Sequence, residues 1–388
     1  MRHGDYSLRK LTYFVVGVCI VIILFMVGAR PLIITLTKRQ LASVFKGSSV
    51  TVGQCKLDPF RFLSLKTLSI KHPSSYKITV DEIRVLFSLP ALSKGTLPDI
   101  VLIKPKVAIT TPKQDIGTFV STHLKLESKG AVLIKRIIIE DLDLSVSAKD
   151  IQLQSGGSLS AHLISQRLES LAMYITSAQG KDYNVSGARC SITQGNEGGK
   201  LVIKEVKVNK LKVSNIISSV YLQGQTLSFR DFSAELLNGK MFGQAQIMVN
   251  PDTSFSVELS VKDIDLAALA RDFEFDNKVS LSGLMEGSST ARGALLGLQQ
   301  LEGHFTTAGE GGELSVKDES YVHAIAKVED VPAAILMESL KNYRYNKGSM
   351  MVGFDKGVIF LDIVFDGLAG KRTFYIKLHD FLTSGGGR

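Results

Sequence analysis

Histidine and acidic side chains are the residues through which this sequence could hold a metal ion or transfer protons. The seven histidines are scattered, and no two stand at the three- or four-residue spacing that places a pair of ligands on one helix face. They are His3, His72, His123, His162, His304, His323 and His379. We therefore expect no histidine-based metal site.

Two pairs of aspartates offer the other candidate for metal binding. Asp141 and Asp143, and likewise Asp263 and Asp265, are separated by one residue, which on a strand places both carboxylates on the same face. Such a pair could bind a cation. Apolar residues such as Leu142 alternate with the aspartates, and this favours the simpler interpretation that the aspartates form the solvated face of a strand.

The sequence lacks the loops that usually bind phosphates or activate a nucleophile. It contains no Gly-x-Ser-x-Gly turn, no P-loop and no Gly-x-Gly-x-x-Gly run. No Cys-x-x-Cys or Cys-x-x-His spacing indicates a zinc site. We expect a protein that is not an enzyme and that needs no metal and no cofactor.

Short stretches of alternating apolar and polar residues dominate the chain after residue 47 and predict β-strands, as in FSVELSV at 255–261. At roughly one strand per 12–15 residues, about 20–25 strands would form a sheet on the order of 100 Å long. A sheet of this length twists and curls. Because one of its faces is apolar, it must close, pack on itself or hold something apolar.

Helices are expected to be few and short after residue 47. Four segments have helix-like spacing of apolar residues: Ser165 to Thr176, Ser214 to Tyr221, Leu266 to Phe273 and Val331 to Leu340. The stretch at 88–110 predicts a short helical or looped piece, a Lys-Gly turn and then two strands around Pro105.

The alternation changes its parity twice within KLVIKEVKVNKLKV, residues 200–213. The apolar positions move from Leu201 and Ile203 to Val206 and Val208, and then to Leu211 and Val213. In a regular strand each change would carry the apolar residues to the other face of the sheet. The sequence therefore predicts bulges or bends in this region.

The run from Leu11 to Ala29 is uncharged and apolar, and Arg9-Lys10 and Arg30 flank it. As a helix it would be about 28 Å long, close to the thickness of the hydrocarbon core of a bilayer, and we interpret it as one transmembrane helix. A cleaved signal peptide is the competing interpretation, although its apolar region is normally shorter.

A juxtamembrane amphipathic helix is expected at residues 30–46, directly after the predicted anchor. Its apolar positions lie near one helical stripe, with Lys38 and Arg39 on the opposite side. These apolar-stripe positions are Leu32, Thr35, Leu36, Leu41, Val44 and Phe45. The segment would continue the anchor, pack on the folded domain or lie at the membrane surface.

The composition indicates a folded protein rather than a disordered or polytopic one, with 45% hydrophobic and 21% charged residues in a chain of 388. The net charge of +9 could indicate nucleic-acid binding. However, the lysines alternate with apolar residues along strands, and no aromatic stacking set accompanies them. We expect no nucleic acid as a partner and attribute the charge to a surface beside anionic lipids.

Several stretches together resemble the AsmA-like family. They are VTVGQCKLDPFRFLSLKTLSI at 50–70, LPALSKGTLPDIVLIKPKVAIT at 89–110, ELLNGKMFGQAQI at 235–247, FSVELSVKDIDLAAL at 255–269, LSGLMEGSSTARG at 281–293 and LEGHFTTAGEGGELSV at 301–316. The closing stretch at 340–381 resembles the C-terminal end of YdbH-type members, which are related to TamB. The chain is shorter than the YdbH-type proteins that bridge two membranes.

The resemblance implies a mainly β protein of the repeating β-groove type, with an N-terminal transmembrane helix followed by an elongated, curled antiparallel β-sheet or groove and a few short helices. Residues 1–10 would be cytoplasmic, 11–29 would cross the bacterial inner membrane, and 47–388 would form a periplasmic domain. The expected partners are phospholipids, the inner membrane and an outer-membrane or periplasmic protein.

The function implied by the resemblance is binding of phospholipid acyl chains in an apolar groove, in support of phospholipid transport between membranes and outer-membrane homeostasis. The groove-lining candidates are Val206, Val208, Leu211, Val213, Val257, Leu259 and Val261. Periodicity alone does not separate a lipid groove from an ordinary dry core. The alternative is therefore a non-enzymatic envelope assembly or scaffold factor, acting in outer-membrane protein biogenesis, with a dry β-core.

Overall fold

The computed structural model describes residues 31–42, 45, 47–58, 61–86, 96–111, 133–148, 152–164, 167–180, 183–193, 198–208, 210–248, 254–272, 279–294, 297–317, 338, 340–355 and 357–378. The predicted membrane helix at 11–29 and the N-terminal segment at 1–10 lie outside these residues. Within the described part of the chain, no helix is both long and apolar enough to cross a bilayer.

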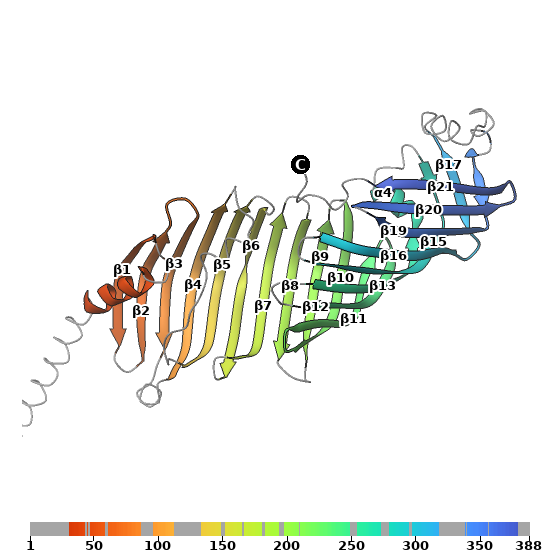
Figure 1. Cartoon of the computed structure of the whole chain (residues 1–388). Helices are drawn as coiled ribbons and strands as arrows, with labels where there is room; N and C mark the ends of the chain where they lie inside the picture. The colour runs from red at the N-terminus through yellow and green to blue at the C-terminus, as the bar shows by residue number, and fades with distance from the viewer. Residues whose placement is uncertain are drawn as a thin grey trace, which may run out of the picture. The chain divides into compact units, whose positions relative to one another are not determined.

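Strands make up most of the described chain, which divides into two compact units, residues 1–169 and 170–388 (Figure 1). The strands of the first unit are β1 (Ser49–Asp58), β2 (Phe62–Lys71), β3 (Tyr76–Leu86), β4 (Thr96–Thr111), β5 (Leu133–Ala148) and β6 (Gln152–Ile164). Neighbouring strands pair in chain order, and all of these pairs are antiparallel except β4–β5, which is parallel. The expectation of a wholly antiparallel sheet is wrong at this one pair.

The second unit is built around a longer antiparallel sheet. Its elements are β7 (Arg167–Gly180), β8 (Tyr183–Thr193), β9 (Gly199–Val208), β10 (Leu211–Gln223), β11 (Thr226–Leu236), β12 (Gly239–Met248), β13 (Ser254–Asp265), α4 (Leu266–Asp272), β14 (Val279–Leu281), β15 (Leu284–Ala294), β16 (Gly297–Ala308), β17 (Gly312–Val316), β18 (Tyr343–Tyr345), β19 (Lys347–Asp355), β20 (Val358–Gly367) and β21 (Gly370–Leu378). The strands β7–β13, β15, β16 and β19–β21 pair in this order. The short strands β14, β17 and β18 form a separate sheet.

A row of irregular residues, which we call the first crease, crosses β1–β5. It consists of Gly53, Thr67, Asp81, Lys104 and Asp141. The φ values are 56° at Thr67, 50° at Lys104 and 53° at Asp141. The register is the same on both sides of this row, although the row itself is not paired in the described strands. Each strand therefore has one more residue at the crease than regular alternation of its side chains between the two faces would require.

The extra residue keeps the apolar side chains on one face. Val52 pairs with Leu68 on one side of the first crease, and Cys55 pairs with Leu65 on the other. Along β2 the apolar positions are thus three residues apart across the crease instead of two. Lys104 bends β4 but does not divide it, so the expected two strands around Pro105 are one continuous strand.

A second crease crosses β7–β10 at Thr176, Gly187, Lys204 and Asn215, where Gly187 and Asn215 have φ values of 61° and 53°. It explains the first predicted change of parity, from Ile203 to Val206, and confirms the predicted bend. The second change has another cause, because Val208 pairs with Leu211 across the turn between β9 and β10. That change is a chain reversal and not a bulge.

Two of the four expected helices are strands. Ser165 to Thr176 lies largely in β7 and Ser214 to Tyr221 lies in β10. Both sequences fit the helical and the strand period. The strand period prevails because ladders on the neighbouring strands pair these residues, as Met173 with Cys190 and Val220 with Phe229.

The other two expected helices have different outcomes. The helix expected at 266–273 is confirmed as α4, and Asp265 caps it by accepting hydrogen bonds from the backbone N–H groups of Ala267 and Ala268. The helix expected at 331–340 lies almost wholly outside the described residues.

The expected amphipathic helix is present at residues 31–42, but its buried face is rotated from the predicted stripe. Ile33, Ile34, Leu41 and Phe45 pack against the buried cluster of the first unit. That cluster consists of Val52, Cys55, Leu65, Leu68, Ile70, Tyr76 and Val80. Leu32 and Leu36, which the stripe included, are 60% and 50% exposed.

Candidate functional site

The apolar face of the second unit is the candidate site. Direct cross-strand partners share a face of a sheet, and the pairings carry this face without interruption from β7 to β21. From β9 to β13 its large side chains are Leu201, Ile203, Val206, Val208, Leu211, Val213, Ile216, Val220, Phe229, Phe232, Ala234, Leu236, Met241, Ile247, Phe255, Val257, Leu259 and Val261.

The seven groove candidates all lie on this face. Val206 pairs directly with Val213, and Val208 pairs with Leu211. Val257, Leu259 and Val261 follow one another along β13. The last two of these belong to one apolar cluster with Val206 and Val213.

Two of the remaining candidates lie outside that cluster. Leu211 packs against the neighbouring cluster of Leu237, Ile264 and Ala268. Val208 is 47% exposed at the end of β9.

The sequence analysis missed several residues at the centre of this face. Ile216, Ala234 and Met241 are buried there, and Phe232 packs against them. Ile216 was hidden by the wrong helix expected at 214–221. The signal that could have found these residues is the reset of alternation after polar residues such as Asn215 and Asp231, both of which have positive φ.

The apolar face is only half-covered over β9–β13. Among the residues that the structure describes, the members of the cluster around Ile216, Ala234 and Met241 all come from the strands of this one sheet, and most of them are only partly buried. In a β-sandwich, a facing sheet about 10 Å away would bury the same side chains. The arrangement can hold an apolar ligand along the surface of the sheet.

A second layer covers the same face at β20 and β21. We call β14, β17 and β18 the cap, because Leu314, Val316, Tyr343 and Tyr345 from its strands form a buried cluster with Phe365. Both tyrosine hydroxyls donate to backbone carbonyls, of Gly370 and Ser282 respectively. Burial raises the pKa of Tyr345 to about 12, so its hydroxyl stays protonated as a donor.

The opposite face of the second unit is polar, with a few exposed apolar side chains. Lys212 and Glu205 form an ion pair at 2.7 Å, which lowers the pKa of the glutamate. Two open hollows on this face share Ser288, Ser289 and Thr290. Phe242 and Tyr375, which line one hollow each, are 43% and 61% exposed.

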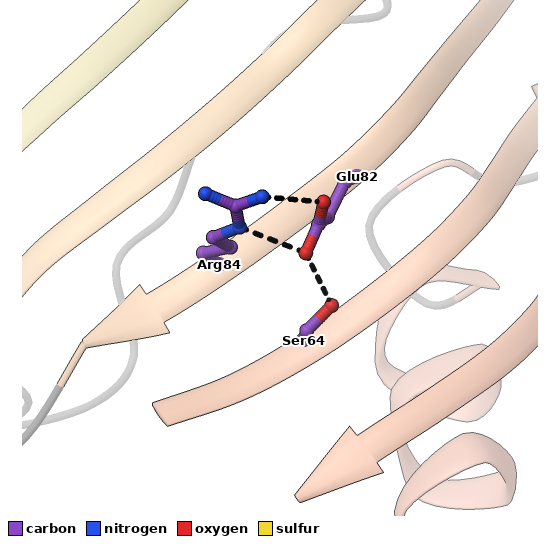
Figure 2. Close-up of polar contacts among 3 residues, drawn as sticks. All are labelled: Ser64, Glu82 and Arg84. Atoms are coloured by element: carbon purple, nitrogen blue, oxygen red, sulfur yellow. Dashed lines mark hydrogen bonds and ion pairs between the residues drawn. The ribbon is translucent and has the colours of Figure 1, made fainter. Parts of the chain in front are cut away.

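The polar face of the first unit carries a tight cluster of Ser64, Glu82 and Arg84 (Figure 2). Arg84 donates to both carboxylate oxygens of Glu82, at 2.8 and 2.9 Å, and Ser64 donates to one of them at 2.7 Å. The hydrogen bonds from Arg84 lower the pKa of Glu82 to about 2. A carboxylate with so low a pKa is neither a proton donor nor an efficient base near neutral pH.

In each aspartate pair, one member lies where the alternation of the described strand is interrupted. Asp141 lies in the first crease and Asp263 at a bulge, both with positive φ, while Asp265 caps α4. Desolvation tends to raise the pKa of Asp265, but hydrogen bonds from Asn238 and from the backbone of α4 outweigh it and lower the pKa. Among the residues that the structure describes, no three histidine, cysteine, aspartate or glutamate side chains gather as metal ligands.

Comparison with known proteins assigns no relative to the chain, because no protein-family model matches the sequence and no curated protein matches it.

Proposed function

We propose that this protein is a membrane-anchored, periplasmic AsmA-like protein of the bacterial inner membrane that binds phospholipid acyl chains and supports phospholipid transport between membranes. The observation that carries the proposal is the half-covered apolar face of β9–β13, to which all seven groove candidates belong. Acyl chains suit such a face because each methylene removed from water contributes about 0.8 kcal/mol.

The mechanism is passive. The sheet presents apolar side chains on successive strands at a spacing of about 4.8 Å, so a chain lying across them meets a similar surface at each step. A similar affinity at each step lets a lipid move along the face without a deep trap. The apolar run at 11–29 would place the protein beside its source of lipid.

The test compares two neighbouring positions on β13 that lie on opposite faces. A photoreactive amino acid replaces Leu259, on the apolar face, or Ser260, on the polar face, in the full chain expressed in bacterial membranes. After illumination in cells, mass spectrometry of the purified chain should find phospholipid adducts at position 259 and none above background at position 260. Equal amounts of adduct at the two positions, or no adduct at either, would contradict the proposal that phospholipid binds on the apolar face.

A charge substitution gives an independent measurement of occupancy. Leu259→Asp should lower the phospholipid extracted with the purified full chain at least about fivefold, because a carboxylate on the apolar face must be desolvated beside an acyl chain. Ser260→Asp, its neighbour on the polar face, should change it less than about twofold. Circular dichroism verifies that both variants are folded, and unchanged lipid in a folded Leu259→Asp protein favours a dry core and an assembly or scaffold role.

A further inference from the structure

Arg372 is the one charged residue on the apolar face of the second unit, among the described residues outside the second crease and the bulges. It pairs directly with Phe365, and its neighbour on the same face of β21 is Phe374. On β20 and β19 this face carries Ile359, Leu361, Ile363, Gly348, Met350 and Val352. The guanidinium of Arg372 is therefore an exception on a face that otherwise carries no charged side chain over the twelve strands at these described positions.

The contacts of Arg372 use little of its hydrogen-bonding capacity. Nη1 donates to the backbone carbonyl of Lys371 at 3.0 Å, and the guanidinium lies 5.7 Å from the centre of the Tyr343 ring in the cap. The Nε atom is buried and has no acceptor among the described residues. A guanidinium carries five N–H donors, and a buried donor without an acceptor is costly.

The geometry suits an anion that arrives with an apolar chain. Guanidinium donors match the oxygens of a phosphate or carboxylate group in pairs. Leu361 of β20 and Met350 and Val352 of β19 lie on the same face outside the cluster that the cap buries, and they would contact the chain of the same molecule. The Tyr343 ring of the cap lies beside the guanidinium. In one lipid molecule, the anionic headgroup would accept hydrogen bonds from the guanidinium and the acyl chain would contact the apolar side chains.

We infer that Arg372 selects anionic amphiphiles, binding the phosphate or carboxylate oxygens of a molecule whose chain lies on the apolar face. This inference rests on the proposed function and adds a headgroup site to it. It predicts a preference for anionic over neutral lipids of the same chain length, by about tenfold if the charge-assisted hydrogen bonds contribute as they commonly do in proteins.

The experiment measures competition between matched lipids on the delipidated full chain in a nonionic detergent. Phosphatidylglycerol competes with diacylglycerol of the same acyl chains, and oleate competes with oleyl alcohol; bound lipid is extracted and quantified by mass spectrometry. The wild type should prefer the anionic member of at least one pair about tenfold, and which pair it is identifies the headgroup as phosphate or carboxylate. Arg372→Met should reduce that preference to less than twofold while binding a similar total amount of lipid.

A matched control exists on the polar face, where Arg189 lies over the Tyr174 ring at 5.3 Å. Arg189→Met removes the same side chain from the same kind of aromatic contact and should leave the preference unchanged. Arg372→Lys keeps the charge and should retain the preference within about threefold, which a merely structural role of Arg372 would not explain. If Arg372→Met does not fold, Arg372→Gln takes its place.

The outcomes separate this inference from the proposed function. A wild-type chain that binds none of the four lipids rejects the proposed function and the headgroup site together. A wild type that binds both members of each pair equally, or an Arg372→Met variant that keeps the preference, rejects the headgroup site alone. Loss of the preference in millimolar inorganic phosphate, with the lipid still bound, would show that Arg372 is a site for free anions and overturn the assignment to lipid.

Discussion

At the scale of single residues, the Glu82 carboxylate of the first unit is fully engaged by its neighbours. Glu82 receives three hydrogen bonds from Arg84 and Ser64, and the carboxylate is held ionised. Lys212 and Glu205 form an ion pair, Asp265 caps α4 and Asp141 lies in the first crease. Arg372 stands apart because its position on the apolar face serves none of these.

The ionised state of Glu82 makes its contribution to stability depend on pH. Its folded pKa of about 2 lies below the ordinary value of 4.5, so the contribution is complete above pH 4.5 and is lost as the pH falls towards 2. Glu82→Gln should therefore lower the free energy of unfolding at pH 7, by about 1 kcal/mol for a partly exposed pair. The two proteins should become equally stable near pH 2.

Chemical denaturation of the full chain at a series of pH values measures this difference. Ser69→Ala, on the neighbouring strand β2, serves as the control. It removes no ionisable group, so its free energy of unfolding should differ from that of the wild type by a similar amount at pH 7 and at pH 2. A difference between Glu82→Gln and wild type that stays constant over this range would contradict the assignment.

At the scale of elements, the creases let a strand change parity without changing face. A positive φ is sterically unfavourable for every residue except glycine, and it is less unfavourable for asparagine and aspartate than for other residues. Asn215, Asp231 and Asp263 therefore suit their positions. Thr67, with φ of 56°, is the most strained of the crease residues because it is β-branched.

Thr67→Gly should accordingly stabilise the first unit, by about 0.5–1 kcal/mol after the entropic cost of glycine is subtracted. Thr79→Gly is the matched control, since Thr79 lies in a regular part of β3 and pairs with Ser69; it should destabilise by about 1 kcal/mol. Equilibrium unfolding in urea measures both. Destabilisation by Thr67→Gly equal to that of the control would show that Thr67 is not strained.

The elements also show where the sequence was informative. The strand-rich class, α4 and the bend near Lys204 followed from alternation and from polar breaks in it. The strands β7 and β10 did not. In β7, Leu168, Leu171 and Ile175 fit the helical period about as well as Leu171, Met173 and Ile175 fit the strand period, and only the pairing with β8 separates the two. The parallel pairing of β4 with β5 has no local signal, since it depends on where the chain returns after Thr111.

The candidate face could be predicted only in the strands where apolar and polar residues alternate regularly. Regular alternation on β13 located Val257, Leu259 and Val261 correctly on one face. The role of Arg372 could not be predicted, because a basic residue at the start of a strand is common and only the pairing with Phe365 shows that its side chain shares the apolar face.

At the scale of the molecule, the proposed lipid binding predicts that a lipid on the half-covered apolar face stabilises the second unit. Loading the delipidated full chain with phosphatidylglycerol at about 100 times its dissociation constant should stabilise the folded state by about 2.7 kcal/mol. For a unit of this size the midpoint of thermal unfolding should rise by about 5 °C or more.

Thermal unfolding followed by circular dichroism in the same detergent checks this expectation. Leu259→Asp should show a smaller rise than Ser260→Asp. Equal rises in the two variants would place the stabilising lipid somewhere other than the face that contains Leu259.

The cap has a consequence for the order in which the molecule is built. Hairpins such as β11–β12 and β20–β21 join neighbours in sequence and close rapidly, whereas β14 must wait for β17 and then for β18, more than sixty residues later along the chain. All three cap strands are nevertheless synthesised before β20 and β21, the strands whose side chains they cover. When β20 and β21 leave the ribosome, a covering layer for Phe365 is therefore already present, and this part of the apolar face is exposed to water only briefly.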